Sequence, residues 1–335
     1  MNFERMKYKS KKGFTGWGQL GFLFAFLGFG VVLAGAVQYL IALQILPAGK
    51  SITDADAIMS AMLAPQNVGM ARLSQVLGTL ALLFIPALLW NFVSNGKSFL
   101  WLGFSKYING YQILLGFAII FTASLVASPL ADFSKYIVAH FPTLDTIAKK
   151  MEATYTEQAT ALSNLKSMQE YIVALFIMAF FPAMFEEVFF RGTLQNLLVK
   201  WLQNPFVAIF ITSVIFSLIH ASIYLFLSRL ALGLALGLMF YYTKNIWVNI
   251  IAHFINNAIA LTQLYSMRNS SEKLNLDKLE PHLHWSIAIL ATAALVGLFI
   301  LLKKHSAYNK AKIEAKENLA IANSNIYGAI VQNEN

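Results

Sequence analysis

About eight stretches of roughly 20 mostly apolar residues run through this chain, a length that crosses the hydrocarbon core of a bilayer as a helix. They cover residues 13–46, 73–93, 111–127, 171–190, 206–225, 227–242, 247–264 and 285–302. This pattern leaves few folds open. It predicts an all-α, polytopic transmembrane helical bundle of about eight spans, since apolar stretches of about this length form membrane-spanning helices.

Composition agrees with a membrane protein. Hydrophobic residues make up 58% of the 335 residues and charged residues 12%, and the mean hydropathy is +0.60. A soluble protein of this length would carry more charge. The chain has no cysteine, which excludes disulfides, thiolate metal sites and a cysteine nucleophile.

The net charge of +9 is better explained by membrane orientation than by nucleic acid, because the basic residues cluster at the ends of apolar stretches. They precede the first stretch and follow every second one: Arg5, Lys7, Lys9, Lys11 and Lys12, then Lys97 and Lys106, Arg191 and Lys200, Lys244, and Lys303 and Lys304. We expect an integral, multi-pass protein of the cell membrane with both termini in the cytoplasm. The bilayer is its expected partner and nucleic acid is not.

Ionisable side chains inside the apolar stretches are the candidate functional residues. Glu186 and Glu187 lie in the fourth stretch, and His220 and His253 lie in later ones; the other four of the six histidines lie in polar or juxtamembrane segments. A charge at membrane depth costs at least ~2.5 kcal/mol on insertion scales, so such residues usually face a bundle interior and mark a site.

The segment 185–192 is predicted to end a helix. Glu187 and Arg191 are i,i+4 neighbours that can form an ion pair, whereas Glu186 points about 100° away around the helix. Glu186, beside a like charge and apolar walls, is then the better candidate for a general base. The alternative is an ordinary helix-end ion pair at the cytoplasmic surface.

Phe216 lies one helical turn before His220, where its ring can orient the imidazole, and His253 shares a helical face with Asn257. A histidine can donate or accept a proton near neutral pH or bind a metal. Two neutral donors side by side, such as His253 and Asn257, could hold an oxyanion. The alternative is that these polar residues only join helices by hydrogen bonds, and Asn256, which faces elsewhere, suits that role better.

These residues resemble the motifs of the CPBP intramembrane peptidases, a family that includes type II CAAX prenyl proteases and bacterial proteins of bacteriocin processing and self-immunity. The family's E-E-x-x-x-R stands as Glu186, Glu187 and Arg191, its F-x-x-x-H as Phe216 and His220, and its H-x-x-x-N/D as His253 and Asn257. The resemblance implies a catalytic helical core at 171–266. From the apolar and basic pattern we expect N-terminal helices and extracytoplasmic loops at 1–170 and a last helix with a polar cytoplasmic tail at 267–335.

The resemblance also implies roles. Glu186 and His220 would activate water, His253 and Asn257 would stabilise the tetrahedral oxyanion, and Arg191 would fix Glu187. The expected activity is that of an intramembrane endopeptidase acting on a membrane-associated peptide or protein, of CAAX type or of bacteriocin or leader type.

Two questions stay open at this stage. No cofactor is expected, but Glu186, His220 and His253 could instead offer a carboxylate and two imidazoles to zinc, leaving a position for water. The rival functions are a non-catalytic immunity or scaffold protein that keeps the fold, and a transporter or proton relay that uses the same buried groups. The chain shows no internal repeat of the kind that many transporters carry.

Overall fold

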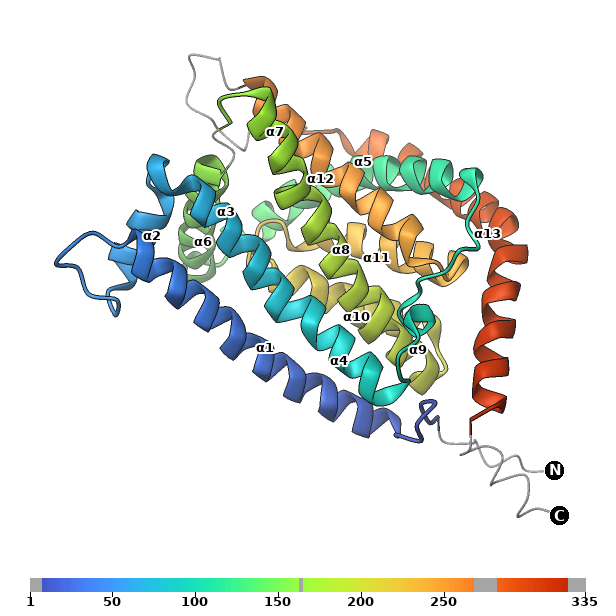
Figure 1. Ribbon diagram of the computed structural model, residues 1–335. Helices are drawn as coiled ribbons and strands as arrows, with labels where there is room; N and C mark the ends of the chain where they lie inside the picture. The colour runs from blue at the N-terminus through green and yellow to red at the C-terminus, as the bar shows by residue number, and fades with distance from the viewer. Residues whose placement is uncertain (1–7, 163–164, 268–281, 325–335) are drawn as a thin grey trace.

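The computed structural model describes residues 8–162, 165–267 and 282–324, and within these ranges the elements are all helical (Figure 1). The predicted all-α bundle is therefore confirmed. The helices are α1 (Gly16–Ile45), α2 (Ala55–Leu63), α3 (Val68–Thr79), α4 (Ile85–Ser94), α5 (Gly110–Ala139), α6 (Pro142–Leu162), α7 (Met168–Ala174), α8 (Phe181–Glu187), α9 (Asn196–Leu202), α10 (Pro205–Ile219), α11 (Phe226–Thr243), α12 (Ile246–Ser266) and α13 (Trp285–Ala322). Wider π turns join α3 to α4 as η2 (Leu80–Phe84), α7 to α8 as η4 (Leu175–Phe180) and α8 to α9 as η5 (Val188–Gln195), and short 3₁₀ turns form η1 (Pro65–Asn67) and η3 (Phe99–Leu102).

Each predicted apolar stretch overlaps a helix, and 6 helices in the described ranges are long and apolar enough to cross a membrane. They are Gly16–Ile45, Pro65–Ser94, Gly110–Ala139, Met168–Leu202, Phe226–Thr243 and Trp285–Ala322. Helix α10 is apolar but only 15 residues long, and α12 is 21 residues long but carries Asn249, His253, Asn256 and Asn257. The chain is an integral multi-pass membrane protein, while the count of about eight spans stays a prediction based on stretch length.

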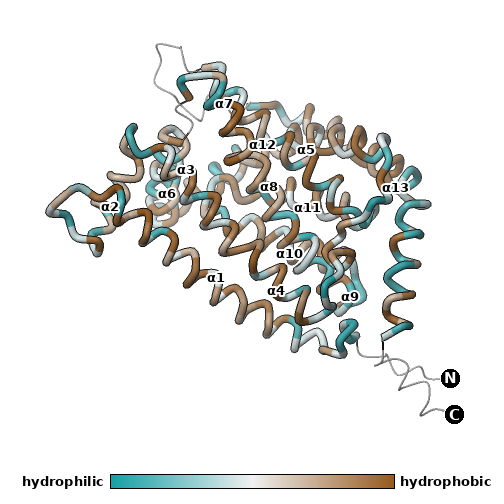
Figure 2. Tube along the Cα trace, viewed as in Figure 1, coloured by the Kyte–Doolittle hydropathy of each residue, from teal (hydrophilic) through white to brown (hydrophobic). Residues whose placement is uncertain are grey.

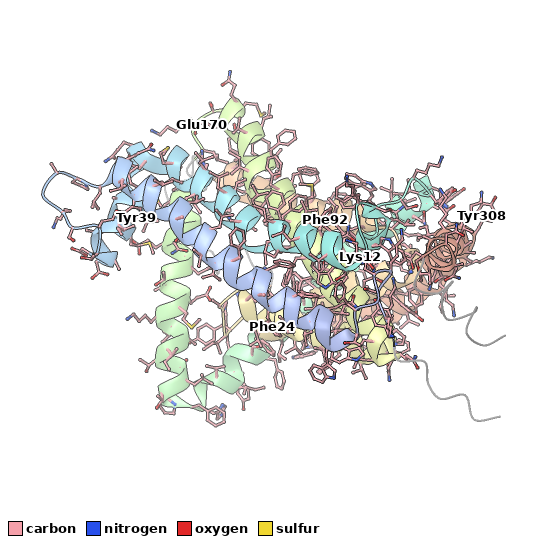
Figure 3. All side chains as sticks on the ribbon, turned by 60° about the horizontal axis from the view of Figure 1, so that its bottom comes forward. Lys12, Phe24, Tyr39, Phe92, Glu170 and Tyr308 are labelled. Carbon is pink, nitrogen blue, oxygen red and sulfur yellow. The ribbon has the colours of Figure 1, made fainter. Side chains whose placement is uncertain are left out.

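The outside of the bundle is apolar along α1 (Figure 2). Phe24 and Tyr39, labelled in Figure 3, are 65% and 52% exposed. Because aromatic side chains this exposed on a long helix suit lipid better than water, α1 presents a lipid-facing surface. Helix α1 begins and α13 ends at the same end of the molecule (Figure 1); the assignment of that end to the cytoplasm stays a prediction.

Two boundaries differ from the sequence prediction. The segment 185–192 does not end a helix, because α7, η4, α8, η5 and α9 form one continuous helical segment, Met168–Leu202. The last helix also extends beyond the apolar stretch 285–302, because α13 continues to Ala322 and buries Glu317. Glu317 forms ion pairs with Lys200, at 3.4 Å, and with Lys244, and these pairs hold the extended helix against the ends of α9 and α11.

Small residues bring α10 and α11 close together. A Cβ added to Gly237 would lie 2.7 Å from Ile209, and one added to Gly233 would lie 3.1 Å from Ser213. This close approach leaves the Gly233 carbonyl beside Arg191. Helix packing therefore accounts for both glycines.

Gly192 is the point at which η5 meets the backbone of η3. A Cβ at Gly192 would lie 2.6 Å from the carbonyl oxygen of Leu102, a backbone atom that cannot move without shifting η3. We expect Gly192→Ala to lower the free energy of unfolding by about 1–3 kcal/mol, the usual cost of overpacking, measured by denaturant unfolding in detergent micelles. Gly21→Ala is the control, since nothing lies within 4 Å of a Cβ at Gly21, and an equal loss in both variants would contradict the prediction.

Candidate active site

Helices α8, α10 and α12 bring three of the predicted site residues together. The Oε2 atom of Glu186 lies 3.7 Å from Nε2 of His220 and 3.9 Å from Nε2 of His253. His220 ends α10, and His253 lies in the middle of α12. These separations exceed a hydrogen bond, and Glu186 Oε2 is buried with no hydrogen-bond partner among the described residues. The geometry thus leaves this carboxylate oxygen free to bond a water molecule or a substrate atom.

Glu187 faces away from this point into a closed polar network. Its Oε1 accepts hydrogen bonds from Arg191 Nη1 at 2.8 Å and from His253 Nδ1 at 2.9 Å, and its Oε2 accepts one from Asn249 Nδ2 at 3.1 Å. Glu187 and Arg191 are both 0% exposed, so this is a buried ion pair and not one at the cytoplasmic surface. The two adjacent glutamates therefore have different environments, as their helical spacing indicates.

Arg191 is held on two further sides. Its Nη2 donates to the carbonyl of Gly233 at 3.2 Å, and its guanidinium lies 4.6 Å from the centroid of the Phe216 ring. The Phe216 ring lies 4.6 Å from the His220 ring and 6.0 Å from the His253 ring. Phe216 therefore packs among all three charged or ionisable groups and sets their spacing.

The hydrogen bonds also fix which imidazole nitrogens carry protons. Carbonyl and carboxylate oxygens can only accept, so His220 Nδ1 donates to the Phe216 carbonyl at 2.6 Å and His253 Nδ1 donates to Glu187. In a neutral imidazole the other nitrogen is then an acceptor. A neutral His253 therefore has no hydrogen on Nε2, which changes the sequence-based picture of two neutral donors at an oxyanion.

A cavity of about 340 Å³ opens at this point. Asn257 lines the same cavity as His253, one turn further along α12. Asn256 instead accepts a hydrogen bond from Ser124 of α5 at 3.1 Å, which confirms that it joins helices. The polar and charged side chains of the cavity lining include Glu186, His220, Arg229, His253 and Asn257.

Helix α6 covers one side of the cavity with Tyr155, Gln158, Ala159 and Leu162. It is anchored to the connection between α10 and α11, where Tyr224 donates to Asp145 at 2.6 Å and Ser222 donates to Glu152 at 3.0 Å. These polar contacts hold α6 across the connection that begins at His220.

Sequence reasoning missed two residues of the site. Arg229 on α11 donates to the carbonyl of His220 at 3.0 Å and lies 5.4 Å from the Tyr155 ring. Asn249 is 0% exposed and donates to both Glu187 and a backbone carbonyl of α11. Asn249 could have been found, because it stands four residues before His253 on the same helical face. Arg229 could also have been found, because it is an ionisable side chain inside the apolar stretch 227–242.

Asn249 positions Glu187, and through it His253. We expect Asn249→Leu to reduce activity per folded molecule about tenfold, since removing one buried hydrogen-bond partner costs ~1–3 kcal/mol, and to do so mainly through kcat. The control is Asn256→Leu on the same helix, because the Asn256 side chain accepts a hydrogen bond from Ser124 and is not part of the Glu187 network. An unchanged kcat in a folded Asn249→Leu protein would refute the positioning role.

Comparison with known proteins gives matches to the part of the chain that forms this site. Residues 168–259 match the family model for type II CAAX prenyl endopeptidases, Rce1-like. The "Putative membrane peptidase YdiL" of Bacillus subtilis (strain 168) is 36% identical over 89 residues, a match that covers 26% of this chain and 36% of that protein. No solved structure matches the chain significantly. All the predicted site residues fall within the family match.

Proposed function

We propose that this chain, whose residues 168–259 match the Rce1-like family model, is a membrane peptidase of the CPBP family that hydrolyses peptide bonds of a membrane-associated substrate inside the bilayer. The observation that carries the proposal is the buried Oε2 of Glu186, which has no hydrogen-bond partner in the described part of the chain and faces two imidazole nitrogens in a cavity. A water molecule bound between Glu186 and His220 would be activated, because both groups can accept its hydrogens.

In the proposed first step, Glu186 takes a proton from this water as the water oxygen attacks the scissile carbonyl carbon. The carbonyl π electrons move to the oxygen, which becomes the oxyanion of a tetrahedral intermediate. The proton held by Glu186 then passes to the amide nitrogen, and the C–N bond breaks to leave an amine and a carboxylic acid. His220, fixed through Nδ1 by its own helix, orients the water.

His253 and Asn257 are proposed to stabilise the oxyanion, an interaction worth about 2.7–4 kcal/mol for one good donor. Asn257 can donate as it stands. His253 can donate through Nε2 only as an imidazolium, because its Nδ1 hydrogen is already bonded to Glu187.

A metal stays the alternative. Glu186, His220 and His253 offer donor types that suit zinc, and the Nδ1 hydrogen bonds of both imidazoles are of the kind that orient metal ligands. We propose a metal-free glutamate mechanism, because Asn257 beside His253 suits an oxyanion better than it supports a metal ligand.

A chelator separates the two mechanisms. We expect cleavage by the purified protein to persist undiminished after dialysis against a strong zinc chelator, and the protein to contain less than stoichiometric zinc by elemental analysis. If activity is lost on chelation and restored by about one equivalent of zinc, the metal-free mechanism is wrong and a zinc-dependent one takes its place.

The function itself is tested in cells. Peptide termini of membrane proteins would be compared between cells that carry the native chain and cells that carry Glu186→Gln at matched expression. Termini present only with the native chain would support a protease and name its substrates. Identical termini would favour the non-catalytic scaffold or immunity protein.

A further inference from the structure

Two surface grooves border the connection between α4 and α5. One has a volume of about 610 Å³ and is lined mainly by apolar side chains, Trp247 among them. The other, also about 610 Å³, is polar in part and includes Tyr107 and Lys316. The two grooves share lining residues, and Lys106 is the charged residue among them. The residues that line both grooves are Phe99, Phe104, Ser105 and Lys106.

The polar part carries an excess of positive charge. Nζ of Lys316 and Nζ of Lys312 lie 4.9 and 5.4 Å from the centroid of the Tyr107 ring, and Lys106 is the neighbouring residue. The two acids of α13 are engaged by other lysines: Glu317 pairs with Lys200 and Lys244, and Glu314 pairs with Lys310 at 3.9 Å. No carboxylate among the described residues therefore neutralises the lysines beside the groove.

The phenol of Tyr107 responds to this charge. Its pKa is lowered, first by a hydrogen bond with Lys316 and then, against the opposing effect of burial, by the charges of Lys316, Lys106 and Lys312. The lysines therefore stabilise the ionised form of the phenol relative to a tyrosine in water. This end of the groove is therefore a favourable place for a negative charge.

The shape of the grooves is fixed by contacts with the start of α12. Nδ2 of Asn245 donates to the carbonyls of Ser105 and Tyr107, both at 3.0 Å, and the amide of Ile246 donates to the Gly103 carbonyl at 2.9 Å. The connection is thus tied down before any ligand arrives, which reduces the cost of ordering it on binding.

We propose that these grooves bind one anionic phospholipid, with an acyl chain in the apolar part and the phosphate headgroup at Lys106 and Lys316. An apolar slot that leads to lysines matches the chemistry of such a lipid, and free phosphate would leave the apolar part unused. Figure 3 shows Tyr308, on the lysine-bearing part of α13, on the same side of the molecule as Lys12 and away from Tyr39. If that end is cytoplasmic, as the basic residues predict, the lysines face the leaflet that carries anionic lipids.

The test uses the full chain in a mild detergent and native mass spectrometry, with phosphatidylglycerol or phosphatidylcholine of the same acyl chains as probes. We expect the native chain to retain phosphatidylglycerol at least about fivefold better, and Lys106→Gln and Lys316→Gln each to reduce that retention about fivefold, the change expected for one lysine near an anionic surface. Lys97→Gln in the same connection is the charge control. Phe99→Ala should weaken retention of both lipids, whereas Phe121→Ala, at a similarly exposed phenylalanine outside the grooves, should not.

Equal retention of the two lipids by the native chain would overturn the proposal, and so would a Lys106→Gln/Lys316→Gln protein that retains phosphatidylglycerol as the native chain does. Competition by inorganic phosphate as effective as that by phosphatidylglycerol would also overturn it, since the site would then bind phosphate without the acyl chain.

Discussion

Glu186→Gln is expected to reduce the rate of peptide cleavage by at least about 10²–10⁴-fold, the contribution of a positioned general base. Glutamine keeps nearly the same volume and leaves the Glu187 network intact, but it cannot accept a proton from water. The loss should appear in kcat, with the protein folded and its melting temperature close to that of the native chain. The measurement is steady-state cleavage of a substrate that the comparison of peptide termini has identified.

Glu157→Gln is the matched control for this result. Glu157 lies on α6 and is exposed, so the same chemical change outside the cavity should leave kcat unchanged. A Glu186→Gln protein with native kcat would show that Glu186 is not the base, and the proposed steps would then fail.

Arg191→Met is expected to lower the free energy of unfolding by about 3–5 kcal/mol, the usual cost of removing one partner of a buried ion pair. Glu187 would be left with a negative charge at 0% exposure and without its guanidinium. Denaturant unfolding in detergent micelles measures the loss. Lys149→Met is the control, because Lys149 pairs with Asp145 at the same i,i+4 spacing and at 2.7 Å but is 70% exposed, and it should cost less than ~1 kcal/mol.

The double variant Glu187→Gln/Arg191→Met tests whether the uncompensated charge causes the loss. Without the negative charge, the double variant should be more stable than Arg191→Met alone, since both partners are then neutral. Its activity should stay low, because the carboxylate that accepts the hydrogen bond from His253 Nδ1 and positions this imidazole would be gone. If the losses of unfolding free energy caused by Glu187→Gln alone and Arg191→Met alone simply add in the double variant, the uncompensated charge is not the cause.

The sequence alone was sufficient to predict the membrane helices and the pairs of site residues that lie four positions apart on one helix. Stretches of apolar residues determine helices in lipid because the backbone must satisfy its own hydrogen bonds there. The i,i+4 spacing of Glu187 and Arg191 determines their pairing, and the same spacing places His253 and Asn257 on one face, because both follow from helical geometry within a few residues.

The sequence could not determine contacts between helices. Glu187 and His253 are separated by 66 positions in the chain, and their hydrogen bond depends on how α8 and α12 pack. That contact decides which nitrogen of His253 carries a proton. The packing of helices also places Arg229 and α6 at the border of the cavity. It brings Lys106 and Lys316 into one groove. Such distances depend on side chains from several helices at once, so only the tertiary structure decides them.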